Sequence, residues 1–238
     1  SNLPPASPLN QLLERSVWWT ALDAAQQSRV RQDARIKTVA ANAYVCRNGE
    51  PVTVWPGVAS GLVMLSNTDP NGRIATLTGV PAGCWFGEGS MLKQEARRYD
   101  AIALRDSTII TIPRATFEWL LANSIGFNRF VLHQINERLG LFIGSLESQR
   151  LLTPEGRLAR CLAYMFNPFL FPGVDTDLSF SQTELAQLTG LSRQRVNQAL
   201  QILEQAELVE VRYGSVTARD IDALRAYPQP PPAAPPTT

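Results

Sequence analysis

Hydrophobic and polar positions change their period twice along the chain, which predicts three segments of different structure. In the first segment, from Tyr44 to Ile112, short β-rich runs alternate with turn sequences such as Asn48-Gly49 and Asp69-Pro70-Asn71-Gly72. Such steps supply the left-handed or preset dihedral angles that tight turns need. Strands that recur about every 8–12 residues are typical of an antiparallel barrel or jelly roll.

The individual elements of this first segment follow from the same pattern. We expect strands over residues 44–47, 52–54, 62–65, 74–77, 101–104 and 108–112. Turns are expected at Pro56-Gly57 and Pro81-Ala82-Gly83. One helix, over about Leu9 to Val30, precedes the strands. The segment therefore predicts an α+β unit.

The second segment, residues 124–152, has the period of a helix. Apolar side chains recur there at spacings of 3, 4, 3 and 4, at Leu132, Ile135, Leu139, Phe142 and Leu146. This is the a/d pattern of a coiled coil. A helix so long needs a partner along its whole length, and a second copy of the chain is the simplest one. We therefore favour a parallel homodimer with these five residues at its interface; the alternative is a core helix that packs on its own barrel.

The third segment, from Thr153, contains local signals for helix starts and stops. Thr153-Pro154 is an N-cap followed by proline at the first helical position. Ser181 and Glu184 form a capping box, Gly190 can take a left-handed turn, and Ser192 caps the next helix to about Glu207. A hairpin over residues 209–218, with Gly214 at its tip, completes the pattern. Two short helices joined by a glycine-containing turn predict a helix-turn-helix with a wing.

The second helix of this motif presents side chains suited to DNA. Arginine pairs with guanine, and glutamine or asparagine pairs with adenine, in the major groove. The DNA-binding candidates are Thr183, Ser192, Arg193, Gln194, Arg195, Asn197, Gln198 and Gln201. Residues 154–227 carry seven basic and nine acidic residues, a net charge of −2, which fits the alternative of an ordinary helical hairpin. The stretch from Ser192 to Leu203 nevertheless holds two arginines and no acid, and the local field matters more than the domain sum.

Composition excludes several classes of protein. The chain has 238 residues and a formal net charge of +1, and no apolar run approaches the 18 residues of a membrane span. Its first residues lack the basic and apolar regions of a secretion signal. Cys46, Cys84 and Cys161 match no metal spacing and cannot all pair, which favours a reducing, cytoplasmic setting. Residues 228–238 form a Pro-rich tail that we expect to be disordered.

Between Leu12 and Tyr227 the chain resembles the Crp/Fnr family of bacterial transcription regulators. Phe86-Gly87-Glu88 with Arg98 ten residues after Glu88, and the run Glu184–Arg193, carry the resemblance. It implies a cyclic-nucleotide-binding-type β-roll sensor over 9–123, a dimerisation helix over 124–152 and a winged helix-turn-helix over 153–227. It also implies a homodimer on a palindromic double-stranded DNA operator, in contact with RNA polymerase.

The resemblance places the effector-pocket candidates at Glu88, Arg98, Tyr99, Phe142 and Ile143. Members that bind cyclic AMP use a glutamate for the ribose, and an arginine followed by a small hydroxyl residue for the phosphate. Glu88 and Arg98 occupy the first two places, but bulky Tyr99 follows Arg98. Phe142-Ile143 replaces the Thr-Ser pair that those members use for adenine. We therefore disfavour cyclic AMP and interpret Glu88 and Arg98 as a structural ion pair.

The other signal chemistries of the family lack their residues here. No N-terminal cysteine cluster is present for an iron–sulfur centre, and His133 is the only candidate for haem ligation. We expect no cofactor, no metal and an effector of unknown identity. The glycines in residues 83–90 lack the Gly-Lys-Ser/Thr ending of a phosphate loop, so we assign no catalytic residue and do not expect an enzyme. The alternative function is a small-molecule sensor whose output is a protein partner.

Overall fold

The computed structural model describes residues 7–151, 153–172, 177–178 and 180–227. The predicted tail, residues 228–238, lies outside this part of the chain. The chain forms two compact units: the first runs to Phe142 and takes in Asn167–Val174, and the second contains Ile143–Phe166 and the chain from Asp175 onward. Each unit is described by itself below.

The first unit opens with two short helices and a 3-10 turn between them, so the single helix expected over residues 9–30 is wrong. They are α1 (Pro8–Arg15), η1 (Trp19–Ala21) and α2 (Ala24–Asp33). Asp23 explains the new start, because its side chain accepts from the Gln26 backbone N–H while the Gln26 side chain accepts from the Asp23 N–H. This capping box fixes the beginning of α2.

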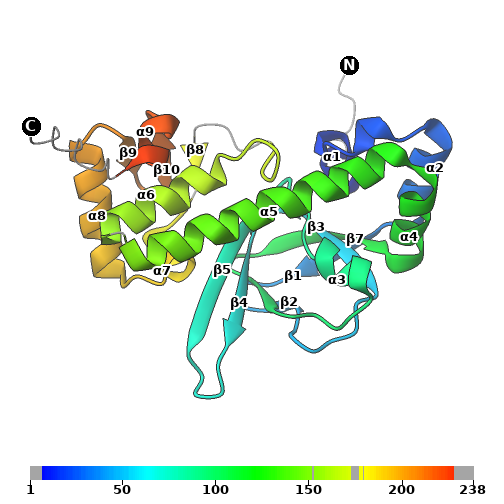
Figure 1. The fold of residues 1–238 in the computed structure, drawn as a ribbon, viewed down its shortest axis with the longest axis horizontal. Helices are drawn as coiled ribbons and strands as arrows, with labels where there is room; N and C mark the ends of the chain where they lie inside the picture. The colour runs from blue at the N-terminus through cyan, green and yellow to red at the C-terminus, as the bar shows by residue number, and fades with distance from the viewer. Residues whose placement is uncertain (1–6, 152, 173–176, 179, 228–238) are drawn as a thin grey trace, which may run out of the picture. The chain divides into compact units, whose positions relative to one another are not determined.

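Seven strands then form two antiparallel sheets, which confirms the expected α+β fold with a β-roll (Figure 1). The strands are β1 (Arg35–Val39), β2 (Tyr44–Cys46), β3 (Val54–Ser60), β4 (Leu62–Thr68), β5 (Ile74–Pro81), β6 (Asp100–Ala103) and β7 (Ser107–Pro113). One sheet has the order β1-β7-β3 and the other β2-β6-β4-β5. Each hydrogen-bonded pair of strands is antiparallel.

The turn expected at Pro56-Gly57 is wrong, because both residues lie inside β3. This strand is at the edge of its sheet, where a proline costs no ladder hydrogen bond. Gly57 is needed for a different reason: a Cβ atom there would lie 2.7 Å from the Trp85 ring. Close packing against a distant tryptophan, and not a turn, accounts for this glycine.

Three helices complete the first unit and cover its aromatic core. They are α3 (Glu88–Lys93), α4 (Arg114–Asn123) and α5 (Ile125–Leu151), whose last residues belong to the second unit. Trp55 stacks on Trp85 with ring centroids 4.5 Å apart, and Phe117 and Phe127 meet Trp55 edge-on. The long helix predicted over residues 124–152 is therefore present, and its N-terminal half packs on the roll.

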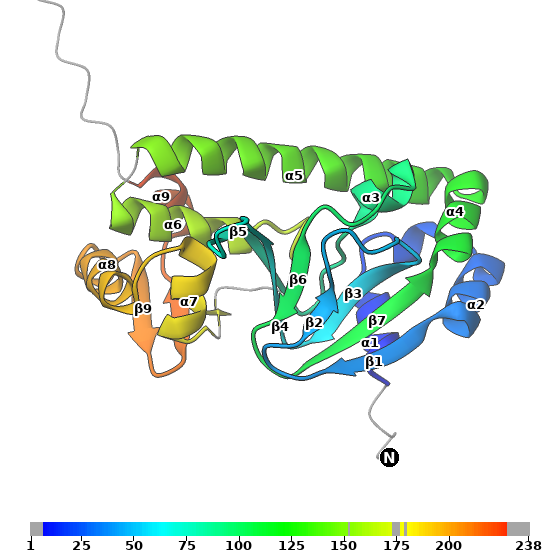
Figure 2. The ribbon, with the colours of Figure 1, turned by 90° about the horizontal axis from the view of Figure 1, so that it is seen from below.

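The second unit is a winged helix-turn-helix, as expected (Figure 2). Its elements are α6 (Pro154–Met165), β8 (Asp177–Leu178), α7 (Gln182–Thr189), α8 (Arg193–Gln205), β9 (Val209–Arg212), β10 (Ser215–Ala218) and α9 (Ile221–Ala226). The three strands form one sheet in the order β8-β10-β9. The short β8 and α9 had no counterpart in the sequence pattern, since two and six residues are too few to show a period.

Candidate nucleic-acid interface and sensor cluster

The helix-turn-helix is built by local capping. The Ser181 hydroxyl accepts from the Glu184 N–H, and the Glu184 carboxylate accepts from the Ser181 N–H at 2.7 Å. Gly190 ends α7 with φ of +67°, a left-handed value that favours glycine. Arg157 on α6 donates to the Thr189 carbonyl at 2.9 Å, which places a cation at the helix C-terminus. These contacts fix the turn between the two helices.

The two helices of the motif pack through the residues predicted for their inner faces. Leu185 and Leu188 of α7 are buried, as are the α8 side chains Val196, Ala199 and Leu200. Burial of one face leaves the opposite face of α8 in solvent. The orientation of α8 is therefore set by apolar packing, which frees its polar residues for a partner.

All eight DNA-binding candidates are exposed. They are Thr183, Ser192, Arg193, Gln194, Arg195, Asn197, Gln198 and Gln201. The Ser192 hydroxyl is already used, because it caps α8 by accepting from the Arg195 N–H. Gln182, which was not predicted, donates from its amide to Asn197 Oδ1 at 3.4 Å. The exposed face of α8 thus presents side chains of the kinds that read base edges.

A groove of about 340 Å³ separates the start of the motif from the wing. Thr183 and Arg193 line one side, and Arg212, Tyr213 and Gly214 of the wing line the other. Gly214 takes φ of +73° at the hairpin tip, and the Tyr213 side chain is fully exposed beside it. The sequence indicated the glycine but not Arg212 or Tyr213, because the strand pattern does not show which wing side chains face the groove.

Four of the five apolar positions predicted for a dimer interface are exposed on α5. The exposed fractions are 68% for Leu132, 56% for Leu139, 41% for Phe142 and 62% for Leu146. Ile135 differs, because it is half-buried and packs against the core of its own chain. Four positions are therefore exposed to solvent in the single chain, whereas Ile135 packs as the alternative of a core helix expects. Phe142 and Ile143, proposed for an effector pocket, are exposed in the single chain.

Glu88 forms a buried ion pair, but its partner is not the predicted one. Arg138 on α5 donates from Nε to Glu88 Oε1 at 2.6 Å and from Nη2 to the Trp85 carbonyl at 2.6 Å. Gln134, one turn earlier, donates to the same carbonyl. Arg98 instead pairs with Glu95 at 2.8 Å and has a side chain 68% exposed. The predicted Glu88–Arg98 pair is wrong, because α3 carries Glu88 toward α5 whereas Arg98 lies in solvent.

Arg97, and not Arg98, is the arginine buried near Glu88. Its Nη2 donates to the Val54 carbonyl. A Cβ atom on Gly87 would lie 2.3 Å from Arg97 Nη1 and 3.6 Å from the Tyr99 hydroxyl, so both side chains pack against this glycine. Burial, and next the Glu88 carboxylate, raise the pKa of the Tyr99 phenol well above its usual value. We call Glu88, Arg97, Tyr99 and Arg138 the sensor cluster.

One signal in the sequence could have indicated Arg138. The α5 residues that pack on the roll are Phe127, Phe130, Val131 and Gln134, a stripe distinct from the exposed apolar one. Arg138 continues this stripe one turn after Gln134. A cation on a stripe that faces the core needs a partner, and the buried Glu88 supplies it.

The remaining candidates for cofactor or redox chemistry are the three cysteines and the histidine. Burial raises the pKa of Cys84 well above its usual value and that of Cys161 to about 12, and burial also raises the pKa of Cys46. Thiols held in the protonated form are poor nucleophiles. His133 is exposed on α5, in agreement with a solvent-facing interpretation. Among the helices that the structure describes, none has the length and hydropathy to span a membrane.

Comparisons with known proteins agree with this architecture. Residues 36–124 match the model of the cyclic nucleotide-binding domain, and residues 156–227 match that of the Crp-like helix-turn-helix domain. The solved structure of FixK2 from Bradyrhizobium japonicum shares the fold, with a TM-score of 0.68 at 18% identity over 80% of this chain and 95% of that one.

Relatives of known sequence extend the similarity. The cAMP-activated global transcriptional regulator CRP of Haemophilus influenzae is 25% identical over 68% of this chain and 73% of its own length. The cyclic AMP receptor protein of Thermus thermophilus is 30% identical over 169 residues, 70% of this chain and 76% of that protein. With both family models matched in order on the expected folds, the chain belongs to the Crp/Fnr family of transcription regulators.

Proposed function

We propose that this protein is a homodimeric, sequence-specific DNA-binding regulator whose recognition helix is α8. The observation that carries the proposal is the exposed polar face of α8, which contains two arginines and no acid between Arg193 and Leu203. Thr183 and Arg193 line the groove beside this face. In a two-fold symmetric dimer, two such helices bind half-sites about one helical turn of DNA, roughly 34 Å, apart.

The proposed dimer has a direct test. Leu139→Asp together with Leu146→Asp places charges on the exposed α5 face without touching the buried stripe, so we expect a folded monomer. Sedimentation velocity at micromolar concentration should show the loss of the dimer, while the circular dichroism of the β-roll and helices is retained. Asn136→Asp, a change at an exposed polar position of the same helix, is the matched control and should leave the dimer intact. A dimer that persists in the double variant would contradict the interface.

We further propose that DNA binding does not depend on cyclic AMP. In the sensor cluster, Arg138 already engages the carboxylate that resembles the ribose-binding glutamate. Arg98, the residue proposed for a phosphate, is directed to Glu95 in solvent. A ligand that used Glu88 would have to compete with Arg138 for its carboxylate.

Selection from random double-stranded DNA tests both the proposed sequence-specific binding and its independence from cyclic AMP. With purified protein at moderate salt and nothing added, we expect recovery of a palindrome with two half-sites. Addition of cyclic AMP should change neither the sequence recovered nor its affinity, which fluorescence anisotropy measures. Recovery only in the presence of cyclic AMP would contradict the effector proposal. Recovery of no site under either condition would contradict the proposal that the protein is a sequence-specific DNA-binding regulator.

The remaining roles follow from the family. Its members are transcription regulators and not enzymes, and we propose none of the described residues as catalytic. We infer action in the cytoplasm, where a regulator meets DNA. Contact with RNA polymerase is part of the same proposal and rests on the family resemblance alone.

A further inference from the structure

The outer face of the wing has the composition of a phosphate-binding surface, with one exception. Side chains alternate between faces along a strand, and the register pairs Arg212 with Ser215 and Glu210 with Thr217. The other face carries Val209 and Val216, which are buried. Arginine and hydroxyl side chains are common ligands of DNA phosphate. Glu210 is the acid among them.

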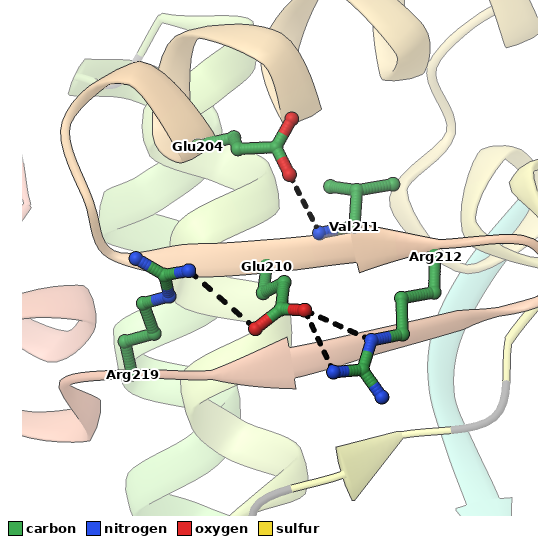
Figure 3. A network of polar contacts seen from close by, with 5 residues as sticks. All are labelled: Glu204, Glu210, Val211, Arg212 and Arg219. Carbon is green, nitrogen blue, oxygen red and sulfur yellow. Dashed lines mark hydrogen bonds and ion pairs between the residues drawn. The ribbon is translucent and has the colours of Figure 1, made fainter.

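Glu210 holds two arginines of the wing at once (Figure 3). Arg212 donates from Nε to Glu210 Oε1 at 2.9 Å, and its Nη2 lies 2.8 Å from the same oxygen. Arg219 donates from Nη2 to Glu210 Oε2 at 3.4 Å. The hydrogen bond and charge of Arg212, and then those of Arg219, lower the pKa of Glu210, so the carboxylate stays charged at neutral pH. We call these three residues the wing network.

Arg212 also lies beside the candidate recognition helix. It lines the groove that Thr183 and Arg193 line from the other side. The Glu204 carboxylate accepts from the Val211 N–H at 2.8 Å, which connects the end of α8 to β9 (Figure 3). The position of the wing relative to the recognition helix is therefore fixed by hydrogen bonding. Arg212 therefore lines the groove while its guanidinium is paired with Glu210.

We propose that Glu210 limits the affinity of this protein for DNA, because it competes with phosphate oxygens for Arg212 and Arg219. Free of DNA, the wing network carries a net charge of +1 instead of +2. While Glu210 holds Arg212, this arginine makes no phosphate contact when DNA enters the groove. The inference rests on the proposed function and adds a residue that sets binding strength without reading sequence.

The test is Glu210→Gln, which keeps the size of the side chain and removes its charge. We expect tighter binding to any duplex at low salt and a steeper salt dependence. Each added phosphate contact weakens binding about 3-fold more between 50 and 200 mM salt, so two wings give about 10-fold. Fluorescence anisotropy with a selected site and a scrambled duplex measures both effects. Asp222→Asn, which removes an exposed acid paired with Arg225 on α9, is the matched control and should have little effect.

A variant that lacks both arginines distinguishes competition by Glu210 for these arginines from a general effect of the Glu210 charge on DNA affinity. In the variant Arg212→Gln/Arg219→Gln, the further change Glu210→Gln should give no gain, because no arginine remains to release. An equal gain in that background would overturn the proposal, as would weaker or unchanged binding by Glu210→Gln alone. Failure of the wild-type protein to bind any duplex would instead overturn the proposed function, and this inference with it. Thermal unfolding of each variant verifies that the wing is folded.

Discussion

Arg193→Ala is expected to abolish the preference for the selected DNA site and to leave the fold and the dimer unchanged. Arg193 is the first residue of α8, it is exposed, and it lines the groove beside the wing. A bidentate contact between arginine and guanine contributes about 1–3 kcal/mol of discrimination. A dimer loses two such contacts, so the ratio of specific to non-specific affinity should fall by about 30-fold or more.

The readout is this ratio, measured by anisotropy with the selected site and with a scrambled duplex. Arg225→Ala on α9 is the matched control, because it removes the same charge from an exposed side chain outside the helix-turn-helix. It should weaken binding to both duplexes slightly and equally. An unchanged ratio in Arg193→Ala would show that α8 does not read the site through this residue.

The helix-turn-helix could be predicted from the sequence because its determinants are local. Ser181, Gly190 and Ser192 each act on residues within three positions, through caps and a left-handed turn. The apolar stripe of α8 repeats at the helical period, so its exposed face followed as well. The eight DNA-binding candidates are exposed, as this pattern predicts.

The sensor cluster could not be predicted in the same way, because its contacts join distant parts of the chain. Glu88 and Arg138 are 50 residues apart, and the pair exists only because the stripe of α5 packs on the roll. Spacing along the chain suggested Arg98, yet the backbone places its neighbour Arg97 inside. Gly57 is a similar case, since its turn-like dipeptide with Pro56 is explained by the distant Trp85 ring.

Arg138→Met is expected to destabilise the first unit strongly, because it leaves the Glu88 carboxylate buried without a counter-charge. The Glu88 side chain is 3% exposed and that of Arg138 is 14% exposed. Among the described residues, Glu88 Oε2 has no hydrogen-bond partner, so the pairing through Oε1 is its main compensation. Removal of one member of a buried pair costs about 3–5 kcal/mol. Urea unfolding followed by tryptophan fluorescence measures this loss, because Trp55 and Trp85 report on the same core.

Arg129→Met and a double variant show whether the loss comes from the unpaired charge. Arg129 is exposed on the same helix, so its replacement should change the free energy of unfolding by no more than about 0.5 kcal/mol. Replacement of both partners, Arg138→Met with Glu88→Leu, should recover most of the stability, since apolar residues of similar volume often equal or exceed a buried ion pair. A double variant as unstable as Arg138→Met alone would mean that Arg138 acts through the Trp85 carbonyl and not through Glu88. Recovery would identify the pair as a link between α3 and α5 that needs no ligand to form.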